Sequence, residues 1–177
     1  MNRTIFMETK RIAFSKWEQG DLEIAELLWG DPAVTRLICA SGRFSKEEIA
    51  ARLQKEIEND AQYHVQYWPL FTRDTGELIG CCGLRPRTEV CFEIGIHLRP
   101  KFWRQGYAAE AMGQVMVYAF SALGAEKLFA GHNPNNAASA GLLRKLEFLP
   151  IGEEFYEPTG LYHPSYELKN PYCFAKK

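Results

Sequence analysis

Residues 93–112 read EIGIHLRPKFWRQGYAAEAM, which is a strand, a basic and aromatic turn, and the start of a helix. Residues 90–98 are apolar and β-rich, and Pro100 ends the strand because it has no N–H to donate. Gly106 has no Cβ, so backbone N–H groups can approach a ligand there, and the helix N-terminus that follows favours an anion. Three cations precede that helix: Arg99, Lys101 and Arg104. The stretch therefore predicts a pyrophosphate site, with a plain strand–helix turn as the alternative.

The bulk properties are those of an ordinary globular protein. The length of 177 residues predicts a single domain over residues 1–177. The chain is 46% hydrophobic and 24% charged, which is ordinary for a globular protein. The net charge of −1 gives no support to a nucleic-acid partner. The five cysteines show no CxxC spacing, and we see no apolar span of membrane length and no signal-peptide core. We expect a cytoplasmic protein with free thiols, no membrane contact and no metal site.

Helical and strand patterns alternate along the rest of the chain. Asp21 is expected to cap a short helix, and Ser45 with Glu48 forms the capping-box signature of a longer one. Strands are predicted at residues 9–17, 63–72, 78–84 and 127–131, a helix at 137–146, and a closing hairpin at 149–157 and 162–168. This order predicts an α/β or α+β fold, in which a crossover helix joins the strands around Glu93 and Leu128.

The turn motif resembles that of a known family. Residues 103–108, WRQGYA, are similar to motif A of the GNAT N-acetyltransferases, Gln/Arg-x-x-Gly-x-Gly/Ala. Trp103 departs from the general form but, with residues 106–111, GYAAEA, resembles the RimJ/RimL-type branch. Further matches are residues 78–80, 83–85, 93–95 and the segment from Asn136 and Ser139 to Phe148. Glu147 stands where the branch has Gly, which leaves the geometry of that turn open.

The resemblance implies a fold, a cosubstrate and a binding mode. The fold would be GNAT-like, with a central mixed, mostly antiparallel sheet that is splayed at the fourth and fifth strands and flanked by about four helices. Acetyl-CoA would be the cosubstrate, and no metal would be needed. The backbone of Ile96, His97 and Leu98 would hold pantetheine. Phosphates would be held by the segment made of Arg104, Gln105, Gly106, Tyr107, Ala108 and Ala109, with contact from at least one nearby cation, such as Arg99.

The chemistry requires a neutral amine. At pH 7, deprotonating an α-amine of pKa about 7.8 costs roughly 1 kcal/mol, whereas a lysine-like amine of pKa about 10.4 costs roughly 4.6 kcal/mol. A weak base acting through water therefore suffices for a protein N-terminus, and Glu93 is the candidate; an ion pair or a solvent-facing position on the sheet is the equal alternative. His97 is a second candidate base, with a structural histidine as its alternative.

The resemblance places Ser139 and Asn136 near the thiol of the cosubstrate. Ser139 would donate a hydrogen bond or a proton to the departing sulfur, and Asn136 can also cap the helix that follows it. Tyr156 and Tyr162 could supply the same proton. The acceptor would lie between the early helices and the closing hairpin, where acidic side chains could attract a cationic amine or could form an ordinary exposed edge. Those side chains are Glu153, Glu154 and Glu157.

The leading prediction is an acetyl-CoA-dependent N-acetyltransferase that acts on a primary amine. The acceptor is either a protein N-terminus or a small amine, and the protein is either a monomer or a homodimer. A non-catalytic acyl-CoA-binding or sensing module on the same fold is the alternative, because it would carry the same cosubstrate motif. A nucleotide-binding domain is a third hypothesis, which predicts stabilisation by ATP or NAD and not by acetyl-CoA.

Overall fold

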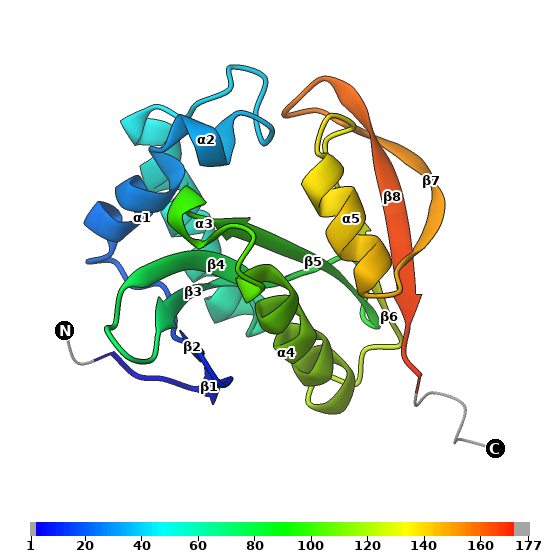
Figure 1. Ribbon diagram of the computed structural model, residues 1–177, viewed down its shortest axis with the longest axis horizontal. Coiled ribbons are helices and arrows are strands. Elements are labelled where there is room, and N and C mark those ends of the chain that lie inside the picture. Colours follow the sequence, from blue (N-terminus) through cyan, green and yellow to red (C-terminus); the bar gives the residue numbers. More distant parts are fainter. Residues whose placement is uncertain (1–2, 172–177) are drawn as a thin grey trace.

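A single eight-stranded sheet runs through the molecule. The computed structural model describes residues 3–171 and orders the strands β1-β2-β3-β4-β5-β6-β8-β7 (Figure 1). Every neighbouring pair is antiparallel except β5 with β6. The strands are β1 Met7–Glu8, β2 Ile12–Phe14, β3 Tyr67–Thr72, β4 Leu78–Pro86, β5 Cys91–Leu98, β6 Lys127–Gly131, β7 Leu149–Tyr156 and β8 Leu161–Lys169. The mixed, mostly antiparallel sheet predicted above is therefore confirmed.

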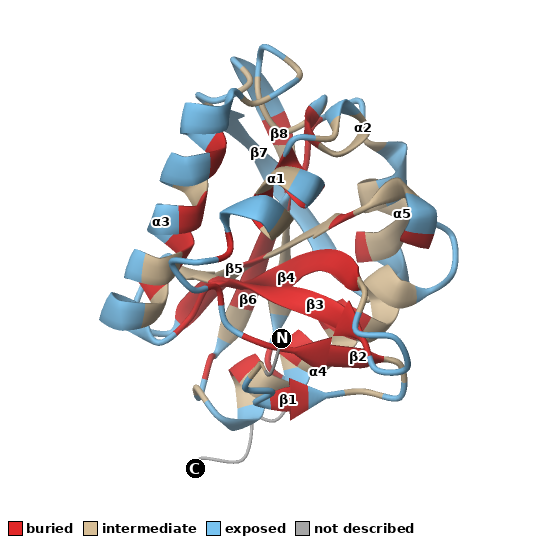
Figure 2. Ribbon diagram, turned by 90° about the vertical axis from the view of Figure 1, so that its left-hand side faces the viewer, coloured by how far each residue is buried: buried red, intermediate tan, exposed pale blue. Residues whose placement is uncertain are grey.

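Helices cover both faces of the sheet and bury two separate apolar clusters. The helices are α1 Leu22–Trp29, α2 Pro32–Thr35, α3 Lys46–Tyr63, α4 Tyr107–Ser121 and α5 Ala137–Lys145, with a 3₁₀ turn at Pro100–Phe102. One cluster packs α4 and α5 against the sheet, and the other packs α1 and α3 against it. Adjacent β4 residues divide between them, because Cys82 belongs to the first cluster and Cys81 to the second. Figure 2 shows the buried central strands in red between helices with exposed outer faces.

Local sequence signals explain where helices α3 and α5 begin. Ser45 and Glu48 form the complete capping box at the start of α3, which confirms that prediction. At the start of α5, Asn136 Oδ1 accepts a hydrogen bond from the Ser139 N–H over 3.1 Å, so Asn136 is an N-cap as expected. Asp21 precedes α1 but makes no capping bond to the helix. Its carboxylate instead accepts from the Glu18 N–H and pairs with Arg3.

Within residues 3–171, three local features differ in detail from what the sequence predicted. The opening strand of residues 9–17 is a hairpin of β1 and β2, whose turn lies at residues 9–11. Tyr63 ends α3 rather than beginning a strand, because the amphipathic pattern of α3 continues to it. Five helices surround the sheet instead of about four, because Asp31 caps the additional short helix α2, which has Pro32 at its first position.

The left-handed turn at Glu147 resolves the geometry left open above. Glu147 has φ = 63°, the conformation that a glycine adopts without steric cost. The turn is thus left-handed although the residue is not glycine. Among residues 3–171, none of the helices combines the length and apolar character that a membrane crossing needs.

Candidate active site

The sheet opens as a fork between β5 and β6. These two strands pair in parallel over three residues only, from Cys91 opposite Lys127 to Glu93 opposite Phe129. Beyond Glu93 the strands diverge, and the gap contains two adjoining hollows. One, here called the groove, extends over the start of α4; the other, here called the pocket, extends over β3–β5 and the β7–β8 hairpin. The residues that line both are Leu37, Ile38, Ile96, His97, Asn136, Ser139 and Leu142.

The turn before α4 presents backbone N–H groups to the groove. Arg104 and Gly106 have φ values of 57° and 83°, and Gly106 precedes α4 with no side-chain capping bond. Uncapped N–H groups at a helix start, preceded by left-handed residues, form a concave anion site. Arg11 supports this turn from β1–β2, because its guanidinium donates to the Gln105 carbonyl over 2.9 Å and pairs with Glu110 over 2.7 Å. The groove therefore has a preformed place for a phosphate.

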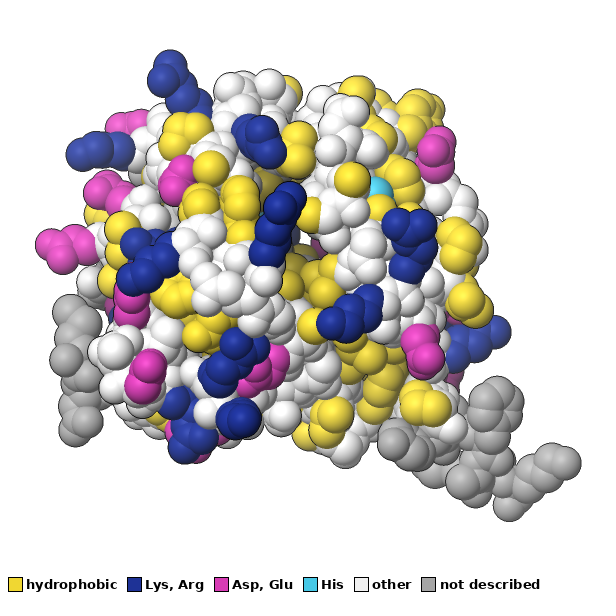
Figure 3. Space-filling view, viewed as in Figure 1, with side chains coloured by type: hydrophobic (Ala, Val, Ile, Leu, Met, Phe, Trp, Pro, Cys, Tyr) yellow, Lys and Arg dark blue, Asp and Glu magenta, His cyan; other side chains and the backbone are white. Residues whose placement is uncertain are grey.

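The cations near this turn divide into paired and unpaired groups. Arg99 and Lys101 both bind Glu77, at 3.2 and 2.6 Å, and neither lines the groove. Arg104 does line it and has no ion pair within residues 3–171. Two further lining cations share that property, Arg36 of the α2 end and Lys145 of α5. Figure 3 shows Lys and Arg side chains around a hollow with hydrophobic walls on this face.

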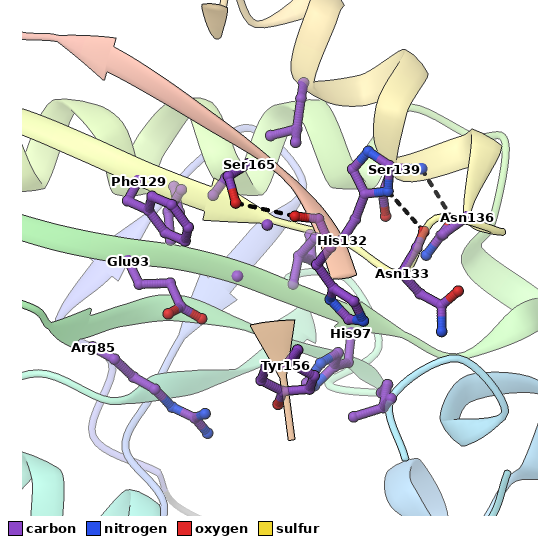
Figure 4. Close-up of a pocket in the computed structure, with 18 of the residues that line it drawn as sticks. Arg85, Glu93, His97, Phe129, His132, Asn133, Asn136, Ser139, Tyr156 and Ser165 are labelled. Carbon is purple, nitrogen blue, oxygen red and sulfur yellow. Dashed lines mark hydrogen bonds between the residues drawn. The ribbon is translucent and has the colours of Figure 1, made fainter. Parts of the chain in front are cut away.

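Glu93 lies at the point of the fork and points into the pocket (Figure 4). Its Oε1 accepts a hydrogen bond from the Tyr67 hydroxyl over 3.2 Å, and its Oε2 lies 3.9 Å from Arg87. Burial and the Glu93 charge raise the pKa of Tyr67 well above its ordinary value, so the phenol is a neutral donor. Gly95 makes this contact possible, because a Cβ there would lie 2.2 Å from the Tyr67 hydroxyl oxygen. Tyr67 thus orients the candidate base.

His97 lies between the groove and the pocket and is held by a tryptophan. The Trp29 Nε1–H donates to His97 Nδ1 over 3.3 Å. Burial, together with the charges of Arg52 and Arg85, lowers the pKa of His97 well below its ordinary value. The ring is therefore neutral near pH 7, and the nitrogen that could take a proton already accepts a hydrogen bond. This geometry favours the structural alternative for His97.

The candidate proton donors differ in position. Ser139 lines both hollows, its N–H is bound to Asn136, and its hydroxyl makes no hydrogen bond within residues 3–171. Tyr156 lines the pocket, where its ring lies 4.7 Å from that of His163 (Figure 4). Tyr162 lies on the outside of the hairpin, is 61% exposed and contacts Phe155. The position of Tyr162 outside both hollows leaves Ser139 and Tyr156 as the candidates near the fork.

The closing hairpin brings little net negative charge to the pocket. Glu153 and Glu157 are exposed and do not line it. Glu154 does line it, but both of its oxygens accept from Arg87, at 2.9 and 3.0 Å. The Arg87 guanidinium in turn lies 3.6 Å from the centre of the Phe129 ring. Of the two alternatives for these glutamates, Glu153 and Glu157 therefore fit the exposed edge, and Glu154, the hairpin glutamate that lines the pocket, is paired with Arg87.

Sequence reasoning did not identify several residues that line or support the site. Arg36, Arg52 and Lys145 lie on three helices distant from the turn motif, and Arg11 and Tyr67 act through contacts more than 25 residues away in sequence. A charged residue at a helical position is ordinarily solvent-facing, so nothing in its immediate neighbours marks it. The aromatic run around Tyr67 predicted a strand and gave no indication that its hydroxyl meets Glu93.

A mixed sheet that opens between two parallel strands, beside a helix start without a side-chain cap, is the arrangement that the resemblance to the GNAT N-acetyltransferases predicted. The acetyltransferase (GNAT) domain family matches residues 11–149, and the chain belongs to this family. The protein is therefore an acetyltransferase that uses acetyl-CoA. It is 31% identical over 148 residues, 82% of this chain and 84% of the relative, to a Bacillus subtilis protein described as the uncharacterized N-acetyltransferase YoaA.

Solved structures share the fold at lower identity. A spermidine N-acetyltransferase from Vibrio cholerae, in complex with CoA and spermine, superposes with a TM-score of 0.75 at 17% identity over 92% of this chain and 97% of that one. RimL, a ribosomal L7/L12 alpha-N-protein acetyltransferase in complex with coenzyme A, gives a TM-score of 0.78 at 16% identity over 94% and 98%. The GNAT fold expected from the sequence is thus confirmed.

Proposed function

We propose that this enzyme is a RimJ/RimL-type N-acetyltransferase that transfers the acetyl group of acetyl-CoA to a primary amine bound in the pocket. The position of Glu93 carries this proposal. It is the last β5 residue paired with β6, and its carboxylate lies in the pocket at the point where the two strands begin to diverge. The acceptor is a protein N-terminal amine or a small amine, the two kinds named by the similar RimL and spermidine N-acetyltransferase structures.

Glu93 is suited to accept the amine's proton through a water molecule. Its two contacts, the Tyr67 hydroxyl and the more distant Arg87, do not use all the lone pairs of a carboxylate. Its side chain is 35% exposed, which leaves room for a water. For an α-amine the deprotonation cost of roughly 1 kcal/mol at pH 7 is within reach of such a weak base.

The groove is suited to the cosubstrate. Its backbone N–H groups from Arg104 to Ala109 lie at the uncapped start of α4, where they would hold the pyrophosphate. The unpaired cations Arg36, Arg104 and Lys145 would meet the remaining phosphate charge. The β5 backbone of Ile96–Leu98 borders the gap left by β6 and would pair with the pantetheine amides. Arg99 instead has a structural role, because it forms an ion pair with Glu77.

Ser139 is the proposed partner of the departing sulfur. Its hydroxyl lies at the start of α5, where the helix dipole favours negative charge, and it lines both hollows. A Ser139→Ala variant that retains wild-type turnover would transfer this role to Tyr156.

The pH–rate profile of Glu93→Gln tests the function and the base together. Acceptor-dependent CoA release is measured over α-amine peptides and small amines. We expect kcat of the variant to be about 100-fold lower near pH 6.5, because general base catalysis contributes on that order. The deficit should shrink above pH 8, where an α-amine of pKa about 7.8 is already neutral.

Glu153→Gln is the matched control, because Glu153 is exposed on the hairpin outside both hollows. It should leave the profile unchanged. A deficit that is the same at every pH would remove Glu93 as the base. Absence of acceptor-dependent CoA release with every amine tested would overturn the transferase proposal itself.

A further inference from the structure

The pocket contains one cation that has no ion-pair partner among residues 3–171. Five charged residues line it: Arg52, Arg85, Arg87, Glu93 and Glu154. Arg85 pairs with the fully buried Glu56, and Arg87 pairs with Glu154. Arg52 has no ion pair and no hydrogen bond within residues 3–171. Its positive charge is therefore left for whatever enters the pocket.

The side chain of Arg52 is held in place rather than free in solvent. Its guanidinium carbon lies 5.2 Å from the centre of the Trp29 ring and 5.4 Å from that of Phe44. The Nε atom is buried and has no hydrogen-bond partner. An arginine that is stacked on aromatic rings and has no ion pair within residues 3–171 is preorganised for a planar anion.

Arg85 adds a second unused donor in the same pocket. Its guanidinium carbon lies 4.3 Å from the centre of the Tyr67 ring, and its Nε is also buried without a partner. Its pairing with Glu56 neutralises its charge but leaves this N–H unbound. Buried donors without partners are uncommon in proteins, so both arginines beside this pocket are incompletely satisfied.

Glu93 and Arg52 thus give the pocket one anionic and one cationic group. The Glu93 carboxylate accepts a hydrogen bond from the neutral Tyr67 hydroxyl, and Arg87 lies 3.9 Å away from it. A simple polyamine would place positive charge near Arg52, and a simple alkylamine would leave Arg52 unsatisfied. An acceptor with both an amine and a carboxylate matches both groups.

We propose that the acceptor of this enzyme is an amino-carboxylate, whose amine lies at Glu93 and whose carboxylate binds Arg52. This inference rests on the proposed function, because it specifies the substrate of the same pocket. The carboxylate belongs either to a free amino acid or to an acidic residue near a peptide N-terminus, and both present the same chemistry to Arg52.

Matched acceptor pairs test the inference. Each free amino acid is compared with its carboxamide, and each peptide beginning with Asp or Glu is compared with its Asn or Gln counterpart, by acceptor-dependent CoA release. We expect the wild-type kcat/KM to be at least tenfold higher for the carboxylate member of one of these series. The series that shows the preference identifies the source of the carboxylate.

Variants at Arg52 connect the preference to this side chain. Arg52→Gln should lower kcat/KM for the carboxylate acceptor by tenfold to a hundredfold, mainly through KM, and leave its amide counterpart unchanged. Arg52→Lys should restore part of the loss, because it keeps the charge without the planar fork. Lys55→Gln is the matched control, since it removes one exposed cation from the same helix α3 and should leave the preference intact.

The outcomes separate the inference from the function on which it rests. Equal or better use of the amides by the wild type, or an equal loss on both members with Arg52→Gln, overturns the amino-carboxylate inference while the transferase stands. Failure of every amine to release CoA overturns both.

Discussion

The groove and the pocket are assembled from different kinds of sequence. Half of the residues that line the groove come from one continuous segment, residues 96–109, whose turn and helix carry their own local signals. The pocket is lined by residues of α3, α4, α5 and of every strand from β3 to β8, and these meet only in the folded protein. A site with a large share of its residues in one segment can be recognised in the sequence. A site built from many strands can be recognised only in the folded protein.

Replacement of Gly106 should break the groove with the largest effect. Its φ of 83° disfavours any side chain, so Gly106→Ala forces the turn to shift at a cost of about 1–2 kcal/mol. We expect KM for acetyl-CoA to rise at least tenfold, with little change in the acceptor preference. Steady-state kinetics over both substrates measures this.

Gly113→Ala is the control for that variant. Gly113 lies within α4, and a Cβ there meets nothing within 4 Å. Alanine should therefore raise stability slightly and leave both KM values unchanged. An equal rise in acetyl-CoA KM for both variants would show that the turn has no special role.

His97, which lies between the groove and the pocket, should make the unfolding free energy of the protein depend on pH. Because its folded pKa is held below the unfolded value of about 6.5, the unfolded chain binds more protons as the pH falls below that value. The contribution of neutral His97 is thus fully present above pH 6.5 and is lost on acidification, by up to about 1.4 kcal/mol per pH unit. The difference in unfolding free energy between wild type and His97→Gln should narrow from pH 8 to pH 5.

Urea unfolding at several pH values measures that difference. His163, whose pKa is also lowered by burial, stays in both proteins and cancels in the comparison. A difference that stays constant across this range would show that His97 is protonated equally in both states.

The smallest expected effect lies outside both hollows. Glu147→Gly places glycine in a left-handed turn and should raise stability by about 1 kcal/mol, or 2–4 °C in Tm, without changing kinetics. Glu126→Gly is the opposite control, because exposed Glu126 has no positive φ and should lose stability. A drop in Tm for Glu147→Gly would contradict the reading of this turn.

The fold was predictable where signals were local. The capping box of Ser45 and Glu48, the Asn136 cap and the strand–turn–helix around Gly106 all appear in the structure as the sequence indicated. The boundary near Tyr63 was not, because an aromatic residue at a helix end has the composition of a strand. Tertiary contact decides such positions.

The candidate site divides along the same line. Residues Ile96–Leu98 and Gly106–Ala109 line the groove, whereas Arg99 forms an ion pair with Glu77 and does not line it. The ion pair between Arg87 and Glu154 joins residues 67 positions apart, so inspection of either segment alone could not foresee that the one hairpin glutamate lining the pocket is paired. Long-range pairing of charges is what the sequence alone could not supply.

The three-residue pairing of β5 with β6 also determines which parts of this fold can change in sequence. The β7–β8 hairpin reaches the rest of the sheet through β6, and it contributes side chains to the pocket but none to the groove. Its outer strand β7 is exposed along almost its whole length, so substitutions there disturb little packing. The sequence of the hairpin, and with it that side of the pocket, can therefore change to suit a new acceptor while the groove residues for the cosubstrate stay the same.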